Sequence, residues 1–378
     1  ICEARAAAEI LNAAGEHSIL LEKLSQWEMH PSSIPRYLEI IESIDSNVLY
    51  RVLKKVKKSD KTSKDAVISK SIIKLVKKSL RVRRLLYKKG VIGTLGRIVN
   101  LIDIGIKKLR ILFYLTRNKK QLYSTFTIPK KDGSPRSISA PEDFLKYTLR
   151  KVLSGILEKE PLHPCCIGFR KGYSTFHNAF PHAGKEMVIN IDIEDFFPTI
   201  TTKRVYGLFY SMGFTPPEAH FLSSITTFEG KLPQGAPTSP AIANLVCRRL
   251  DRRLAGLASK AGASYTRYAD DITFSGSSEI RRIIPLAERI IKEEGFNINK
   301  KKIRILRKGR RQEVTGLTVN NGVHVPRKLR RIVRAMIHRL NSGEVPHYKG
   351  KDMSPEQVIG YVSYMQGIEK QRAILQQK

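Results

Sequence analysis

The sequence is short of cysteines and acidic residues, and it has no long apolar run. Four cysteines occur in 378 residues without metal-ligand spacing, and the neighbours Cys165 and Cys166 are poorly placed for an ordinary disulfide. No stretch reaches the roughly 18 to 20 apolar residues of a membrane-spanning helix. Residues 91–106 come nearest and are interrupted by Arg97 and Asp103. No signal-peptide pattern is present. We therefore expect a reducing cytoplasmic location and no membrane partner.

The shortage of acidic residues leaves a large positive charge. The 34 Asp and Glu are outnumbered by 68 Lys and Arg, which gives a formal net charge of +34 and an isoelectric point near 10.1. Such a charge opposes compaction unless an anion neutralises it. Lys and Arg clusters gain affinity by releasing counterions from a phosphate backbone, so nucleic acid is favoured over an anionic membrane surface. A hydrophobic content of 41% indicates a globular protein, and the length predicts two or three cooperating lobes.

Residues 1–112 are expected to be helical and contain no recognisable catalytic motif. Within them, Ile68, Ile72, Val76 and Leu80 recur every four residues and predict one apolar helix face. Between residues 51 and 89, 16 Lys and Arg accompany only two acidic residues. A bias this one-sided favours a surface that follows phosphates over a helix face that is merely solvated.

From residue 123 the pattern changes to short extended runs. Residues 123–128 and 136–139 predict a hairpin with a basic tip at 130–135, followed by a helix over 143–157. Another helix is predicted after Ser239, which offers an N-cap, and Pro240, which suits the first helical position. Apolar residues at 242, 245, 246, 250 and 254 give that helix one buried side.

Three aspartates lie at the expected ends of strands. Asp192 follows the apolar run 187–191, and Asp270 and Asp271 stand at the tip between the alternating runs 264–268 and 272–275. Phosphoryl transfer to a hydroxyl uses two divalent metals about 3.5 to 4 Å apart, and magnesium prefers carboxylate oxygens as ligands. An isolated Asp-Asp pair is more often a turn than a metal site, so the interpretation depends on the surrounding motifs.

Those motifs occur in a characteristic order. Residues 192–197 read DIEDFF, residues 232–240 read LPQGAPTSP and residues 268–271 read YADD. Together they resemble the palm of reverse transcriptases, over roughly residues 123–319, with a thumb expected beyond. The resemblance implies an RNA-directed DNA polymerase with two Mg²⁺ ions, for which Mn²⁺ is an alternative. It makes Asp192 and Asp270 the principal metal ligands and Asp271 a weaker third carboxylate.

The resemblance also assigns residues to the incoming nucleotide. Lys130 and Arg136 match fingers residues that hold the triphosphate, one as a point charge and the other as a bidentate fork. The turn at Gln234 and Gly235 matches the segment under the nascent base pair, where glycine lets the backbone approach closely. Phe197 matches the residue whose bulk excludes a 2′-hydroxyl, which implies deoxynucleotide substrates; the alternative for this side chain is ordinary core packing.

Two short motifs narrow the family. Residues 178–182 read NAFPH and resemble the Asn-Ala-x-x-His signature of retron reverse transcriptases, and residues 314–316 read VTG and resemble their Val-Thr-Gly signature. Taken alone, such a histidine is more often a satisfied loop residue and such a glycine a bulge in a strand. We expect contributions to RNA binding from Asn178, His182, Val314, Thr315 and Gly316.

The retron resemblance has biological implications. It implies a bacterial enzyme that binds its own structured noncoding RNA, primes from the 2′-hydroxyl of a guanosine and copies part of that RNA into multicopy single-stranded DNA. It also implies a role in antiphage defence together with an effector protein.

Residues 300–339 form a further basic stretch, with 14 Lys and Arg and one acidic residue, Glu313. This stretch contains a predicted hairpin over 313–325 that turns at Asn320-Asn321-Gly322, and a basic helix from Lys328. Such a helix can lie along an A-form stem and contact phosphates and 2′-hydroxyls. We expect RNA contacts from the cations of this helix: Arg327, Lys328, Arg330, Arg331 and Arg334.

The sequence thus predicts an α+β right-hand polymerase of fingers, palm and thumb behind a basic helical N-terminal region. The expected boundaries are 1–112 for that region, 113–318 for fingers and palm, and 319–378 for a helical thumb. Two alternatives stay open: a group II intron-type or other bacterial reverse transcriptase, and a catalytically vestigial RNA-binding scaffold. The lack of a Cys/His cluster disfavours an intron protein with a zinc-containing endonuclease, and the three intact aspartates disfavour the scaffold.

Overall fold

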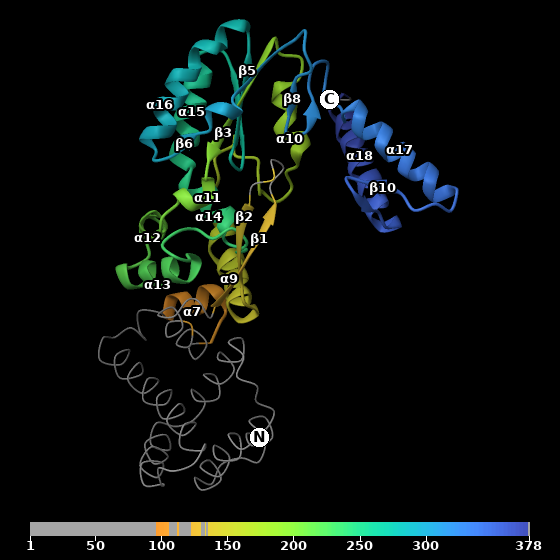
Figure 1. Cartoon of the computed structure of the whole chain (residues 1–378). Helices are drawn as coiled ribbons and strands as arrows, with labels where there is room; N and C mark the ends of the chain where they lie inside the picture. The colour runs from red at the N-terminus through yellow and green to blue at the C-terminus, as the bar shows by residue number, and fades with distance from the viewer. Residues whose placement is uncertain (1–95, 106–111, 113–121, 130–132, 134, 377–378) are drawn as a thin grey trace, which may run out of the picture. The chain divides into compact units, whose positions relative to one another are not determined.

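The computed structural model describes residues 96–105, 112, 122–129, 133 and 135–376 (Figure 1). Most of the predicted N-terminal region, including the basic stretch 51–89, lies outside these residues, and so does Lys130. The chain divides into two compact units. Among the described residues, the first contains those up to Glu160 together with Ile200–Ser239, and the second contains Pro161–Thr199 and Pro240 onward.

The first unit combines the predicted hairpin with helices. Strands β1 (Tyr123–Pro129) and β2 (Pro135–Pro141) pair antiparallel over their whole length. Helix α9 (Asp143–Gly155) buries Leu145, Leu149 and Val152, whose spacing of four and three residues defines one helix face. It ends before the predicted residue 157, and the 3₁₀ turn η3 (Leu157–Lys159) follows. The other helices of this unit are α7 (Gly96–Ile102), α12 (Thr202–Ser211) and α13 (Pro216–Thr226).

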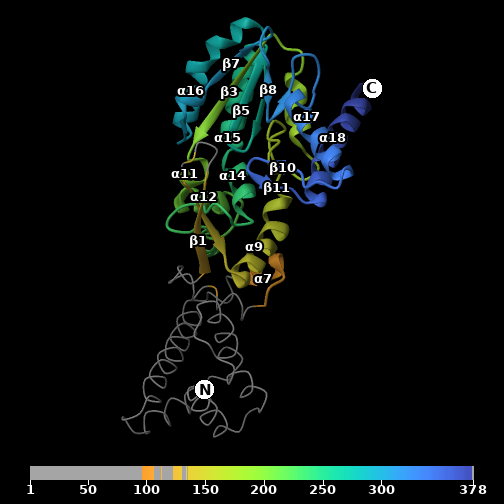
Figure 2. The same ribbon diagram turned by 45° about the vertical axis from the view of Figure 1, so that its right-hand side comes forward.

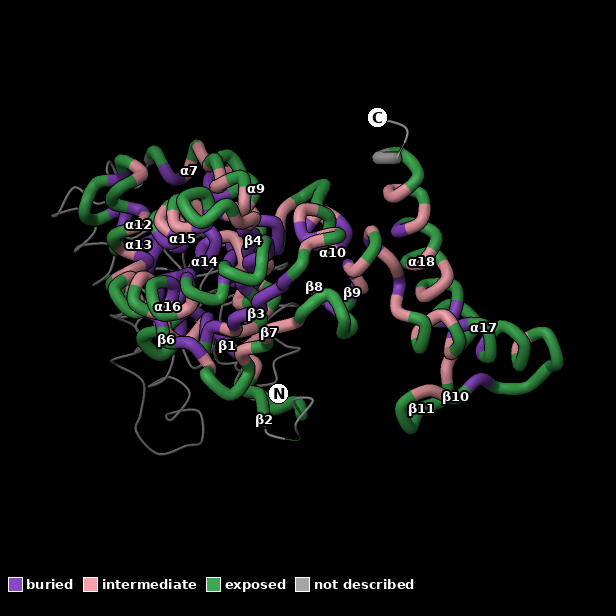
Figure 3. The backbone as a smooth tube through the Cα atoms, turned by 90° about the horizontal axis from the view of Figure 1, so that it is seen from above, coloured by how far each residue is buried: buried purple, intermediate pink, exposed green. Residues whose placement is uncertain are grey.

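The second unit is built on a five-stranded sheet in the order β4-β5-β3-β6, with β7 also paired to β3. Strands β3, β5 and β7 of this sheet are labelled in Figure 2. The strands are β3 (Met187–Glu194), β4 (Ser264–Tyr268), β5 (Asp271–Gly276), β6 (Asn297–Ile298) and β7 (Arg304–Arg307). All these pairs are antiparallel. The first five residues of β3 are buried, which explains why the central strand has a continuous apolar run rather than alternation (Figure 3).

Strand alternation gives the sheet two different faces. Tyr265 and Arg267 of β4 bond to Asp251 of helix α15 (Arg248–Lys260), whereas Thr266 bonds to His182 of the 3₁₀ turn η4 (Phe180–His182). Helix α16 (Ile284–Glu293) packs beside α15. Adjacent residues of one strand therefore serve opposite faces of the sheet.

The predicted long helix after Ser239 is in fact two helices, α14 (Ser239–Val246) and α15, separated at Cys247. Cys247 has φ −83° and ψ 1°, which takes the chain out of helical geometry. The predicted N-cap role of Ser239 is also wrong, because its hydroxyl donates to the Pro233 carbonyl at 2.7 Å and the helix already includes this residue. Sequence periodicity could not distinguish one helix from two with a common apolar side.

The C-terminal part contains a hairpin that the sequence placed differently. Strands β8 (Glu313–Val314) and β9 (Leu317–Thr318) pair across a tight turn at Thr315 and Gly316, whose φ values are 45° and 81°. Positive φ at both positions is typical of a type I′ turn. The chain reverses again around Asn320–Gly322, where Thr318 and His324 form a bridge. The prediction of a single turn at 320–322 was therefore incomplete.

The remaining helices follow this hairpin or lie near the sheet. They are α10 (Thr175–Ala179), α11 (Phe196–Thr199), α17 (Arg327–Asn341) and α18 (Pro355–Gln376), with the 3₁₀ turns η5 (Ser278–Ile283) and η6 (Lys300–Lys302) and the short pair β10 (His347–Tyr348) and β11 (Lys351–Asp352). No helix among the described residues is long and apolar enough to cross a membrane.

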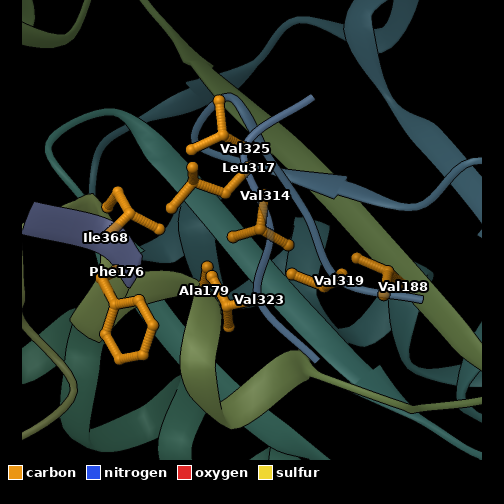
Figure 4. Packing of buried hydrophobic residues seen from close by; sticks show 9 residues of the cluster. All are labelled: Phe176, Ala179, Val188, Val314, Leu317, Val319, Val323, Val325 and Ile368. Atoms are coloured by element: carbon orange, nitrogen blue, oxygen red, sulfur yellow. The ribbon is translucent and has the colours of Figure 1, made fainter. Parts of the chain in front are cut away.

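One apolar cluster joins α10, β3, the β8–β9 hairpin and α18 (Figure 4). Its members are Phe176, Ala179, Val188, Val314, Leu317, Val319, Val323, Val325 and Ile368. The cluster thus packs the β8–β9 hairpin and helix α18 against strand β3 of the sheet.

Candidate active site

The three predicted metal ligands lie at one end of the sheet, with Asp192 and Asp271 on neighbouring strands and Asp270 in the turn before β5. Asp192 of β3 is the register partner of Asp271, the first residue of β5. Asp270 precedes it in the turn from β4, and its carbonyl accepts a 3.0 Å hydrogen bond from the Ile193 amide. The hairpin tip and the strand end are thus joined as the sequence predicted.

Both carboxylates and cationic side chains surround these aspartates, and they act on the pKa of Asp271 in opposite directions. Burial, and then repulsion by Asp270 and Asp192, raises the pKa of Asp271 from 3.8 to about 6, while Arg304 and Lys302 lower it. Asp271 is exposed at the protein surface, where repulsion from the two neighbouring carboxylates acts on its charged form. The Lys302 ammonium lies 3.2 Å from Asp192 Oδ2. Cationic side chains therefore already compensate part of the negative charge.

The donor set suits hard divalent cations, which bind carboxylate oxygens and relieve their mutual repulsion. Within the described residues, however, no three His, Cys, Asp or Glu side chains already converge as a finished metal cage. The three aspartates therefore fit divalent cations by the chemistry of their carboxylates and by their placement at one end of the sheet. A cation bound at Asp192 has to compete with Lys302.

Phe197, the predicted sugar-discriminating residue, lies on α11 in an aromatic group. Its ring centroid is 5.4 Å from that of Phe196 and 6.3 Å from that of Phe169. Phe169 also lies 6.4 Å from Tyr268, the last residue of β4, is exposed, and has φ 57°. Phe197 itself is only half-buried, so part of its surface is available to a ligand.

The predicted triphosphate and base-pair residues of the first unit lie on the hairpin and beside it. Arg136 of β2 is exposed opposite Ile128. The Gln234 carbonyl accepts a 2.7 Å hydrogen bond from the Ser139 amide, which ties the glycine turn to β2. Gly235 has φ 122°, and a Cβ there would lie 3.0 Å from the Ser139 carbonyl oxygen. Only glycine fits this close approach without strain.

The two retron-type motifs meet in the structure. Asn178 Nδ2 donates to Thr315 Oγ1 at 3.4 Å, and the Thr315 hydroxyl donates to the Thr175 carbonyl at the same distance. Val314 is buried in the apolar cluster of Figure 4 and Gly316 is exposed in the turn. Of these residues, Thr315 and Gly316 retain exposure for an RNA contact, whereas Asn178 and Val314 face the protein interior.

His182 is also fully buried. Its Nδ1 lies 2.7 Å from the Ser275 hydroxyl and its Nε2 lies 2.8 Å from the Thr266 hydroxyl. Burial, followed by the Lys185 charge, lowers the pKa of His182 from 6.5 to about 3, so the ring is neutral. In this structure His182 joins β4 and β5 instead of reaching RNA, because neither ring nitrogen is accessible.

Helix α17 begins at Arg327, one residue before the predicted start, and presents its cations outward. Val333 and Met336 are its buried residues, while Arg327, Lys328, Arg331 and Arg334 are exposed and Arg330 is half-buried. None of these five cations forms an ion pair with a carboxylate of the described chain. The helix face is therefore available to an anion.

Sequence reasoning missed Arg267, Asp251 and Lys302. Arg267 and Asp251 form a fully buried ion pair next to the turn at Ala269 and Asp270, with Nε and Oδ1 2.7 Å apart. Arg267 lies between Thr266 and Tyr268 in a short strand-like run, and no local pattern distinguishes it from a solvent-facing cation. Lys302 belongs to a run of three lysines, in which nothing in the sequence distinguishes one from another.

The three described cysteines, Cys165, Cys166 and Cys247, are free, in agreement with the prediction that the neighbouring pair forms no disulfide. Burial raises the pKa of the Cys166 thiol to about 11, with Arg267 acting in the opposite direction, so this cysteine is a protonated packing residue. It is an unsuitable nucleophile.

Comparisons with known proteins agree with the motifs. A family model described as reverse transcriptase (RNA-dependent DNA polymerase) matches residues 128–320. The retron Mx65 reverse transcriptase of Myxococcus xanthus is 41% identical over 243 residues, which are 59% of this chain and 57% of that protein. The retron Mx162 enzyme of the same organism is 36% identical over 313 residues, 73% of this chain and 64% of that protein.

A relative from another organism is matched over more of its length. The retron Ec86 reverse transcriptase of Escherichia coli is 36% identical over 272 residues, 70% of this chain and 82% of that protein. The matches to the two Myxococcus proteins span less than two thirds of their length. These findings confirm the predicted family and the α+β right-hand polymerase fold: the chain belongs to the reverse transcriptases, and among them to the retron type.

Proposed function

We propose that this chain is an RNA-directed DNA polymerase that adds deoxynucleotides to a primer paired with an RNA template. The observation that carries the proposal is the pairing of Asp192 with Asp271 across β3 and β5, with Asp270 bonded to Ile193, in a chain of the reverse transcriptase family. Three carboxylates on adjacent strand ends support two-metal phosphoryl transfer better than a scaffold that only binds RNA.

Divalent metal ions are the general cofactors of this family, and we infer that Mg²⁺ is the ion used here. When bound, two such ions supply charge stabilisation to the attacking oxygen and the leaving pyrophosphate. Asp192 and Asp270 are the proposed principal ligands and Asp271 the third. Lys302 is positioned to hold Asp192 in place, since its ammonium is 3.2 Å from that carboxylate.

The remaining residues bind and orient the substrate. Arg136 is exposed and carries a bidentate fork suited to a triphosphate, and Lys130 has the same proposed role. Gln234 and Gly235 form the turn beneath the nascent pair. Phe197 excludes a 2′-hydroxyl by its bulk, so that deoxynucleotides are selected.

We further infer the retron reaction: a structured noncoding RNA serves as primer and template, synthesis starts from a guanosine 2′-hydroxyl, and the product is multicopy single-stranded DNA joined to RNA. A role in antiphage defence with an effector protein belongs to the same proposal. The similarity to three retron enzymes supports this reading over a group II intron-type reverse transcriptase.

Two experiments test the proposal at its two levels. Extension of a DNA primer on an RNA template, with and without Mg²⁺, tests the polymerase activity, and no extension under either condition would contradict it. Sequencing the nucleic acid that copurifies with the protein tests the retron reaction. A branched RNA–DNA molecule that loses its DNA on treatment with a debranching enzyme is expected; unbranched RNA alone, from a protein active in primer extension, would contradict the branched-primer proposal.

A further inference from the structure

The turn that carries Asp270 has an unusual backbone. Strands β4 and β5 pair as far as Tyr268 and Asp271, so Ala269 and Asp270 form a two-residue loop. Ala269 has φ 59°, a conformation that residues other than glycine rarely adopt. Two-residue hairpins that need positive φ at the first position usually have glycine there. With alanine in this position, surrounding contacts must hold the turn.

A buried arginine provides such a contact. Arg267 is fully buried, and its Nη1 donates to the Ala269 carbonyl at 3.0 Å and to Asn244 Oδ1 at 3.1 Å. Its Nε and Nη2 donate to the two carboxylate oxygens of Asp251, each at 2.7 Å, and Nη2 also reaches Cys166 Sγ at 3.2 Å. All five N–H bonds of the guanidinium therefore have an acceptor.

The main chain beside the turn is fastened to the same arginine. The Arg267 amide donates to the Cys165 carbonyl at 2.8 Å, and the Arg267 carbonyl accepts from the Ile167 amide at 2.9 Å. Gly168 follows, where a Cβ would lie 2.4 Å from the Ala269 nitrogen. Asn244 completes the arrangement by donating to the Gly168 carbonyl at 2.8 Å. Ala269 is thus held both by the guanidinium and by close backbone packing.

We propose that Arg267 is a positioning residue for catalysis: by holding the Ala269 carbonyl, it fixes the strained turn in the conformation that presents Asp270 to the metal ions. A buried ion pair contributes little net stability compared with apolar side chains of similar volume. The location of this pair, under the residue before Asp270, is better explained by control of the turn. The inference rests on the proposed role of Asp270 as a metal ligand.

The decisive variant replaces the ion pair by apolar side chains, Arg267→Met with Asp251→Leu, which protein interiors often tolerate. It removes the contact to Ala269. We expect the variant to fold with a lowered thermal midpoint, because the Tyr265 hydroxyl and Asn244 Oδ1 also lose their partners, and to keep its affinity for an RNA–DNA primer-template within about twofold of the wild type. The maximal single-turnover rate of nucleotide addition should fall roughly 10- to 100-fold, and half-saturation by Mg²⁺ should need more of the ion, as for loss of one hydrogen bond that orients a charged group.

A matched control separates positioning from stability. Tyr265→Phe removes the 2.8 Å hydrogen bond to Asp251 but leaves Arg267 on the Ala269 carbonyl. It should lower stability while the maximal rate stays within about threefold of the wild type. Arg267→Lys keeps a positive charge opposite Asp251 without the fork that reaches Ala269, and it should behave like the double variant.

The outcomes are distinguishable. A folded double or lysine variant with wild-type maximal rate and Mg²⁺ dependence overturns the positioning role. Failure of both variants to fold also overturns it, because the network is then a requirement of folding. Asp270→Ala is measured alongside: if that variant is active, the metal-ligand assignment itself fails, whatever the Arg267 variants do.

Discussion

The proposed role of the basic face of α17 in RNA binding can be tested through the salt dependence of that binding. Arg327, Arg331 and Arg334 are exposed and recur at intervals of four and three residues, so they share one face of the helix. If each neutralises one phosphate of an A-form stem, replacing all three by glutamine should reduce the slope of log affinity against log salt by roughly 0.7 to 0.9 per contact, about 2 to 3 in total.

The same relation gives the size of the effect. Because each released counterion contributes in proportion to the logarithm of the salt concentration, the triple variant should bind about 100- to 500-fold more weakly at 0.1 M salt and about equally near 1 M. Fluorescence anisotropy of the labelled cognate RNA over a range of KCl concentrations measures both quantities. Retained helix content, measured by circular dichroism, shows that α17 is intact.

A charge-matched control uses Arg252, Lys260 and Lys292, which are exposed cations of α15 and α16. Replacing them by glutamine removes the same net charge from other helices and should change the slope little. An equal loss in this control refutes the reasoning, because net charge rather than the α17 face then governs binding. An equal loss of affinity for the cognate RNA and for a generic primer-template would mean that α17 binds nucleic acid without selecting a particular RNA.

Three other residues give independent predictions. Phe197→Val should weaken discrimination against ribonucleotides at least roughly tenfold in single-nucleotide incorporation, and unchanged discrimination would make Phe197 a packing residue. Gly235→Ala should lower the thermal midpoint more than Gly230→Ala, because both have positive φ but only Gly235 has the Ser139 carbonyl 3.0 Å from the added Cβ. His182, whose folded pKa is about 3 against 6.5 when unfolded, contributes stability that is full above pH 6.5 and declines as the pH falls. Denaturant titrations measure this as the free energy of unfolding between about pH 6.5 and 4.5. Over that range the wild type should lose up to about 1.4 kcal/mol more per pH unit than His182→Gln, and parallel pH profiles would contradict this.

Sequence patterns predicted the elements whose side chains repeat regularly. The run 187–191, the runs on either side of Ala269-Asp270 and the hairpin at 123–139 each correspond to observed strands, because short extended runs rich in β-branched and aromatic residues and bounded by turn residues favour strands. The order of the motifs in the sequence then predicted that Asp192 lies close to the Asp270-Asp271 pair. The pairing of Asp192 with Asp271 across β3 and β5 agrees with that prediction.

What the sequence could not supply depends on contacts between distant segments. Nothing local indicates that Arg267 is buried against Asp251, since charged residues in strands usually face solvent. Likewise, the meeting of Asn178 with Thr315 spans 137 positions, and the burial of His182 requires the hydroxyls of two other strands. The break at Cys247 was hidden because the apolar residues of α14 and α15 continue one helical period across it.

The most direct test of the central claim is single-turnover nucleotide addition by the Asp192→Asn and Asp270→Asn variants on an RNA template. Asparagine keeps the size of each side chain and removes the charge that binds metal. Loss of a metal ion costs several kcal/mol of charge stabilisation, so the rate should fall by roughly three orders of magnitude or more while primer-template affinity stays near the wild-type value. Near-wild-type rates in either variant would contradict the account.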